Sequence, residues 1–236
     1  MDKPSSVELL WGAVERPSRG PKPAMSLEKI VHAAVAIVDK EGLGALSMQR
    51  VAKEFGFTTM SLYRYVPGKY ELIDLMIDTV VGPPPDLSGL SGWRAKLTKW
   101  ARLTWDAFQR HPWYLDAATH RIMGPNQIGW LEVAVDALRG NGLRGQDLLD
   151  AVLVVNGHVR SLAPFAASWV PAKNELSPQE WGAAIYTQIV QHPEVFPALT
   201  EAIGDGAFGP DNEDQLEFGL LRVLDGIEVL IKERAG

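Results

Sequence analysis

The stretch Phe57–Leu72, "FTTMSLYRYVPGKYEL", brings together side chains that can contact a nucleic acid. Its first half is rich in short hydroxyl side chains, which can exchange hydrogen bonds with base edges, and Met60 there can contact the methyl group of thymine. Farther along the stretch, Tyr63 and Tyr65 have phenol groups that can reach phosphates, and Lys69 adds its charge to the backbone N–H groups at the start of a helix. The hydroxyl residues are Thr58, Thr59 and Ser61.

The charge around this stretch is basic although the chain as a whole is acidic. The formal net charge is −6, whereas residues 1–81 hold 10 basic and 10 acidic residues. Within residues 47–69, Arg50, Lys53, Arg64 and Lys69 face one acidic residue, Glu54. This local excess favours an anionic partner. Charge alone leaves open the alternative of a solvated helical face without a partner.

The elements that position these residues are predicted to be short helices. Apolar residues at three- and four-residue spacing predict a helix from Ser26 that ends at Gly42. Ser47 is a typical N-cap for a second helix over 47–55, and a third helix follows over 58–65 after a turn at Gly56. This spacing is that of a helix-turn-helix, in which the second helix enters the major groove. Three-helix corners with the same spacing also occur in proteins that bind no DNA.

The rest of the chain is predicted to be helical as well, so the fold class is all-α. The Pro- and Gly-rich segment 82–92 cannot continue a helix and is the expected domain boundary. Residues 1–24 lack periodicity and are expected to form a mobile arm. Its cations could lie in a minor groove, but a solvated tail is the favoured interpretation. Further helices are expected near 92–110, 112–121, 126–140, 145–169, 178–191 and 212–234.

Residues 26–81 resemble the DNA-binding domain of the tetracycline-repressor (TetR) family of transcription regulators. The resemblance lies in the Glu-Gly pair after the first helix, the Ser-capped second helix, the Gly-Phe turn and "SLYRYVPGKYEL". It implies DNA contacts from the helix-turn-helix, with Tyr65 and Lys69 as phosphate anchors. The residues to which it assigns DNA contacts are Gln49, Arg50, Thr58, Thr59, Met60, Ser61, Tyr63, Tyr65 and Lys69.

The resemblance also implies a function for the whole chain. It implies a homodimeric repressor that binds a palindromic operator through residues 25–81 and is released by a small-molecule inducer. Residues 91–236 would then form a helical regulatory and dimerisation domain. Apolar seams in the helices near 145–169 and 212–234 suit helix packing, either inside one chain or across a two-fold interface. The alternative is a dimeric DNA-binding regulator without an inducer, whose C-terminal domain serves dimerisation or a protein partner.

Aromatic residues are concentrated after residue 92, where seven of the eight tryptophans lie. Most of them are expected to be core, but pockets are also lined by aromatic side chains with a few polar groups. Asn156 and His158 interrupt an apolar helix, so each needs a partner, which could be a ligand, a water molecule or the other subunit. The candidate residues for an apolar or aromatic inducer are Trp105, Phe108, Trp113, His120, Trp130, Asn156, His158 and Trp169.

Other classes of protein are disfavoured by what the sequence lacks. Without cysteine there is no disulfide, thiolate metal site or cysteine nucleophile. The five histidines show no metal-binding spacing, and no nucleophile-elbow, P-loop or dinucleotide motif is present. We therefore expect no enzyme, metal or cofactor. No apolar run reaches the length of a membrane span or signal peptide, so a cytoplasmic protein is expected.

Overall fold

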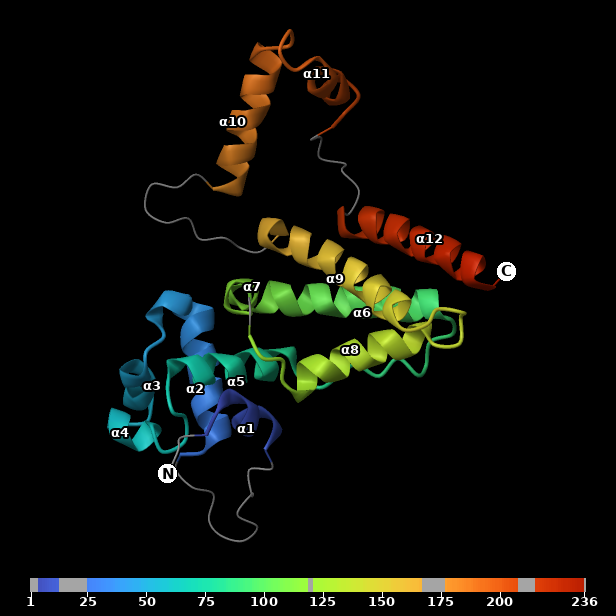
Figure 1. Ribbon diagram of the computed structural model, residues 1–236. Helices are drawn as coiled ribbons and strands as arrows, with labels where there is room; N and C mark the ends of the chain where they lie inside the picture. Colours follow the sequence, from blue (N-terminus) through green and yellow to red (C-terminus); the bar gives the residue numbers. More distant parts are fainter. Residues whose placement is uncertain (1–3, 13–24, 119–120, 167–176, 208–214, 236) are drawn as a thin grey trace.

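The computed structural model describes residues 4–12, 25–118, 121–166, 177–207 and 215–235. The described residues are helical with connecting turns and contain no strand, which confirms the all-α fold (Figure 1). One 3₁₀ turn, Leu43–Ala45, lies among the α-helices. These are α1 (Ser6–Trp11), α2 (Leu27–Glu41), α3 (Met48–Glu54), α4 (Thr59–Leu62), α5 (Lys69–Val81), α6 (Trp93–Arg110), α7 (Trp113–Ala117), α8 (Pro125–Leu138), α9 (Gln146–Ala166), α10 (Pro178–Gln191), α11 (Pro197–Gly204) and α12 (Gln215–Ala235).

Helices α2 to α5 form the N-terminal unit around one apolar core. The Ser26 hydroxyl caps α2 by accepting from the Lys29 backbone N–H, and Gly42 ends the helix with a φ of +81°. The buried face of α2 packs against α5, with Ile30, Ala34 and Leu72 completely buried. This packing fixes the frame on which α3 and α4 sit.

Helix α1 differs from the expected arm over residues 1–24. Ser5 and Glu8 form a capping box, an S-x-x-E signal that is visible in the sequence. The Ser6 hydroxyl donates to the Asp74 carboxylate of α5, and the Trp11 indole donates to the Met123 carbonyl at 3.1 Å. These partners are distant in the sequence, so local pattern could not reveal them. Residues 13–24, with the arm's cations, lie outside the described residues.

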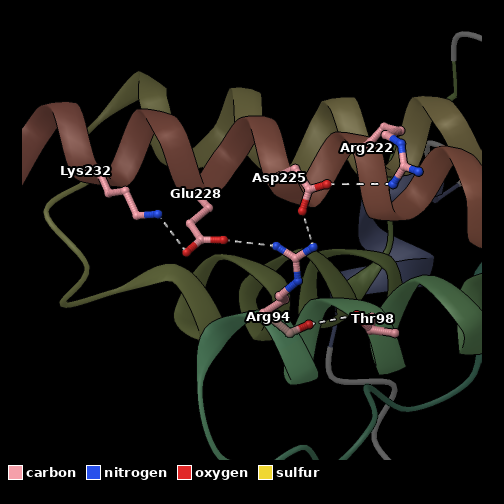
Figure 2. Close-up of polar contacts among 6 residues, drawn as sticks. All are labelled: Arg94, Thr98, Arg222, Asp225, Glu228 and Lys232. Atoms are coloured by element: carbon pink, nitrogen blue, oxygen red, sulfur yellow. Dashed lines mark hydrogen bonds and ion pairs between the residues drawn. The ribbon is translucent and has the colours of Figure 1, made fainter.

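The C-terminal helices α6, α8, α9 and α12 form a bundle above α5 (Figure 1). The seams predicted in α9 and α12 face each other and the core, where Val155, Val159, Leu220 and Leu224 are completely buried. Figure 2 shows Arg94 of α6 between two carboxylates of α12, Asp225 and Glu228. The Arg94–Glu228 contact measures 3.3 Å. The two seams are therefore used within one chain.

Helices α10 and α11 contact each other and stand apart from the bundle (Figure 1). The predicted helix over 178–191 is α10, whereas α11 was not predicted from the sequence. Several of their large apolar side chains are exposed, among them Trp181 of α10 and Leu199 of α11. Across the described ranges, every helix is too short or too polar to span a bilayer.

Candidate DNA-binding surface and ligand cavity

Helices α3 and α4 meet in a helix-turn-helix whose turn depends on glycine. Gly56 has a φ of +66°, a left-handed conformation that side-chain-bearing residues rarely adopt. The Phe57 N–H then donates to the Ala52 carbonyl at 3.1 Å, which closes the turn against the end of α3. Leu62 is completely buried and fixes the short α4 on the core. The outer face of α4 is thereby presented to solvent.

The hydroxyl residues of α4 are partly engaged at its N-terminus. The Thr58 hydroxyl accepts from the Ser61 N–H at 3.4 Å and lies 3.1 Å from the Ser61 hydroxyl. Thr59 is half-buried, whereas 74% of Met60 is exposed, more than any other large apolar side chain of the described residues. Met60 is therefore the most exposed apolar side chain of α4, the helix predicted to enter the major groove. Thr58 also acts as the N-cap of this helix.

The predicted contacts of α3 lie on its exposed side. Gln49 and Arg50 are both exposed. The Arg50 guanidinium pairs with Glu41 at 2.8 Å and lies 3.5 Å from Glu54. If Arg50 contacts a phosphate of DNA, the phosphate therefore replaces carboxylate partners that the guanidinium already has.

The predicted phosphate anchors follow α4. Tyr63 and Tyr65 are each 36% exposed, while Val66 beside them is completely buried and holds this segment on the core. Lys69 is the exposed first residue of α5, and Gly68 before it provides no side-chain cap. The N–H groups of the first turn of α5 are therefore not capped by the N-cap side chain, which suits an external anion.

A cavity of about 330 Å³ lies among α6, α8 and α9, next to α7 and the end of α5. Its wall is largely apolar and includes four aromatic side chains, and its polar members come from three helices and the α7–α8 connection. The aromatic lining residues are Trp100, Phe108, Tyr114 and Trp130. The polar and charged ones are Thr104, Arg121, Gln127, Asn156 and Arg160.

The predicted ligand residues fall into three groups. Phe108, Trp130 and Asn156 line the cavity. Three others are not part of this lining, namely Trp105, Trp113 and His158. His120 and Trp169 lie outside the described residues.

The residues outside the lining have structural partners. Trp105 packs against the apolar core. The Trp113 indole donates to Asp39 of α2 at 2.6 Å. A ring nitrogen of His158 lies 3.0 Å from the Leu216 carbonyl of α12, so the partner that His158 needs comes from its own chain.

The sequence did not indicate Trp100, Tyr114, Gln127 and Arg121 as lining residues. Trp100 was the most accessible to prediction, because it lies two helical turns before Phe108 and therefore on the same face of α6. Arg121 could not be found, since its partners are far away in the sequence.

Asp78 of α5 connects the cavity wall to the N-terminal unit. Its carboxylate accepts from the backbone N–H groups of Gln127 at 3.0 Å and Asn126 at 3.3 Å. The Gln127 side chain donates to the Tyr114 hydroxyl at 3.0 Å, inside the cavity. Burial raises the pKa of Asp78, and the two backbone hydrogen bonds offset part of that rise. Gly124 leaves room for this carboxylate, because an added Cβ would lie 2.3 Å from the Asp78 carboxyl carbon.

Arg121 makes a second connection between the cavity and α5. Its guanidinium pairs with Asp74 at 2.9 Å and donates to the Tyr70 carbonyl at 3.2 Å. It also stacks over the Tyr70 ring, 4.1 Å from the centroid. Tyr70 is adjacent to Lys69, so this contact runs from the cavity to the predicted phosphate anchor.

Asp39, near the end of α2, makes a third connection. Besides the Trp113 indole, a ring nitrogen of His111 lies 2.8 Å from its carboxylate. The cavity-lining residues Phe108 and Tyr114 flank this pair in the sequence. Three carboxylates of the N-terminal unit, Asp39, Asp74 and Asp78, are thus held by groups in or next to the cavity. No group of three or more acidic or histidine side chains within the described residues could hold a metal ion.

Comparison with family models gives two adjacent matches. Residues 30–76 match the model described as "Bacterial regulatory proteins, tetR family". Residues 85–231 match the model described as "Tetracyclin repressor-like, C-terminal domain".

Individual proteins are similar over nearly the whole chain. The HTH-type transcriptional repressor DrrR1 of Streptomyces coeruleorubidus is 43% identical over 239 residues, which cover 98% of this chain and 87% of that protein. ActR of Streptomyces coelicolor, solved with actinorhodin, superimposes with a TM-score of 0.72 at 26% identity, covering 86% of this chain and 95% of ActR. ActR in complex with (S)-DNPA gives 0.71 at 25% identity, covering 88% and 99%.

Proposed function

Because the chain belongs to the TetR family of bacterial transcriptional regulators, we propose that it is a repressor that a small molecule releases from its operator. The observation that carries this proposal is the cavity, whose wall is hydrogen-bonded to the helix that begins at Lys69. Its volume of about 330 Å³ lies at the lower end of the range typical of small-molecule sites.

DNA binding is assigned to the surface formed by α3, α4 and the start of α5. Helix α4 enters the major groove with Met60 and Thr59 toward the bases, while Tyr63, Tyr65 and Lys69 contact phosphates. Two copies of this surface must lie about 34–36 Å apart to read successive major grooves on one face of the duplex. The functional unit is therefore a homodimer on a palindromic operator.

The dimer interface is assigned to the outer faces of α9 and α12. The apolar seams of these helices are used inside the chain, which leaves the opposite faces for a partner. Val154 of α9 and Phe218 and Val229 of α12 lie on these faces and are each more than half exposed. Gly157 lies on the same face of α9 with open space around it, which permits close approach of a second helix. A two-fold axis there would join like surfaces.

Ligand binding reaches the DNA-binding surface through α5. A ligand that displaces Gln127 or Tyr114 disturbs the hydrogen bonds that link these residues to Asp78. The free-energy cost of this displacement is smaller when Asp78 and α5 shift together with Gln127 and Tyr114. The ligand then stabilises a spacing of the two helix-turn-helix units that fits the operator less well. Couplings of this kind are typically about 1–3 kcal/mol.

The competing function is a regulator without an inducer, in which the C-terminal helices serve dimerisation or a protein partner. The cavity favours induction over this alternative. Fragments selected from random DNA by the purified protein supply the operator, and a library of aromatic compounds is then tested for binding and for operator release. Compounds that bind in the cavity and leave operator affinity unchanged would support the competing function.

A further inference from the structure

The charged groups of the cavity are unevenly balanced. Of the described residues, two arginines, Arg121 and Arg160, line it, and no aspartate or glutamate does. Arg121 is neutralised by its ion pair with Asp74, in which the two side chains are 14% and 0% exposed. Among the described lining residues, Arg160 is therefore the charged side chain without an ion-pair partner.

Arg160 has no hydrogen bond or ion pair to any other described residue. Among the described arginines that are not exposed, Arg94 and Arg121 both pair with carboxylates, whereas Arg160 does not. Its charge nevertheless acts inside the cavity. Burial raises the pKa of Tyr114, the Gln127 hydrogen bond and the positive charge of Arg160 lower it in part, and the negative charge of Asp78 raises it to a smaller extent.

The other polar lining groups show where an acceptor would be held. The Thr104 hydroxyl donates to the Trp100 carbonyl at 2.9 Å, and the Gln127 amide donates to the Tyr114 hydroxyl. Asn156, like Arg160, has no hydrogen-bond partner within the described residues. The two lie four residues apart on α9 and therefore on the same side of the helix. Unengaged donors are thus concentrated on the α9 side of the cavity.

These observations indicate which ligand charge the cavity favours. Aromatic walls alone would attract a cationic ligand through their ring faces. A partly buried guanidinium opposes a cation and forms strong charge-assisted hydrogen bonds with a carboxylate. We infer that the cavity binds an aromatic acid, with its anionic group on Arg160 and Asn156 and its rings between Trp100, Phe108 and Trp130. This inference rests on the proposed function, since it specifies the ligand of the same cavity.

The test compares matched aromatic acids and amides. Naphthoate and anthraquinone carboxylate, each beside its neutral carboxamide, are titrated into the full chain while tryptophan fluorescence and heat are recorded. We expect at least one acid to bind about tenfold or more tighter than its amide. Arg160→Gln should abolish this preference, and Arg160→Lys should retain part of it. Arg144→Gln, which removes an exposed positive charge outside the lining, should leave the preference intact.

The outcomes separate the ligand class from the proposed function. Amides that bind as tightly as acids, or an acid preference that survives in Arg160→Gln, would overturn the inference and leave induction in place. Absence of binding by every pair would contradict both the inference and the assignment of the cavity as a ligand site. Operator binding without ligand reports whether each variant is folded. If Arg160→Gln does not fold, Asn156→Leu replaces it and should lower the acid preference.

Discussion

At the scale of single residues, the proposed DNA-binding surface has two expected roles: some side chains read base edges and others anchor the protein to phosphates. Met60 projects from α4, while Tyr63, Tyr65 and Lys69 lie where α4 ends and α5 begins. Reading residues determine which operator is preferred, whereas anchors contribute to affinity for any duplex.

Lys69→Ala should weaken binding to all DNA sequences by a similar factor. Loss of one phosphate contact should also reduce the slope of log affinity against log salt by about 1. Fluorescence anisotropy at several salt concentrations measures both quantities. Lys99→Ala, an exposed lysine of α6, is the matched control and should change neither. A changed sequence preference in Lys69→Ala would contradict its role as an anchor.

Met60→Ala should change the preferred operator and leave the salt dependence intact. If Met60 contacts a thymine methyl, its removal should reduce discrimination at that base pair by on the order of 1 kcal/mol. Binding to a panel of single-base operator variants measures the effect. If the wild-type protein and Met60→Ala ranked these operator variants identically, the proposed contact between Met60 and a base would be contradicted.

The sequence predicted the helix-turn-helix because the determinants of its geometry are local. The caps Ser26 and Ser47, the glycine turn at Gly56 and the break before Lys69 all act within a few residues of their own position. The cavity was harder to predict, since its lining converges from separate helices. Arg121 is held by Asp74, 47 residues away, and no local pattern indicates such a pair.

At the scale of elements, α5 makes two of the three carboxylate connections between the N-terminal unit and the cavity, and Asp39 of α2 makes the third. Helix α5 starts at the DNA-binding surface and carries Asp74 and Asp78, which are bound by groups lining or adjoining the cavity. The close approach of Gly124 to Asp78 permits α8 to dock on α5. Disturbing this contact should affect stability and coupling together.

Gly124→Ala should destabilise the protein, because its new Cβ would lie 2.3 Å from the Asp78 carboxyl carbon. The expected loss is about 1–3 kcal/mol, as for other overpacked sites. Gly182→Ala is a matched control, since nothing lies within 4 Å of its added Cβ and alanine favours a helix. Urea denaturation measures both. A stability of Gly124→Ala equal to wild type would contradict the close docking of α8 on α5.

Asp78 should also give the stability a recognisable pH dependence. Because burial raises its pKa in the folded state, the folded protein binds this proton more readily than the unfolded chain. The contribution of Asp78 to the free energy of unfolding is therefore larger at low pH and is lost as pH rises through the raised pKa. Relative to Asp78→Asn, the wild type should be more stable at pH about 4 than at neutral pH. A difference that does not vary with pH would contradict this environment.

At the scale of the whole molecule, the proposed function requires two copies of the chain held at a defined spacing. The seams of α9 and α12 were predicted from their periodicity, but the sequence could not decide between burial within one chain and burial between two. The structure places the seams inside the chain, and their outer faces are proposed to form the dimer.

Val154→Arg combined with Val229→Arg should convert the dimer to a monomer, because each substitution places a charge in the proposed apolar interface. Operator affinity should fall with it, since a monomer reads a single half-site. Analytical ultracentrifugation measures the oligomeric state. Leu90→Arg, in the connection between α5 and α6, is the control. A stable dimer in the double variant would show that the interface lies elsewhere on the protein.

Induction by a small molecule is tested most directly by the operator affinity of the protein with its cavity empty and with its cavity occupied. Occupancy is followed by quenching of tryptophan fluorescence, with Trp100 and Trp130 in the cavity wall. The account predicts that an aromatic acid at saturating concentration lowers operator affinity by about 5- to 150-fold. An operator affinity that stays constant while the cavity fills would contradict it.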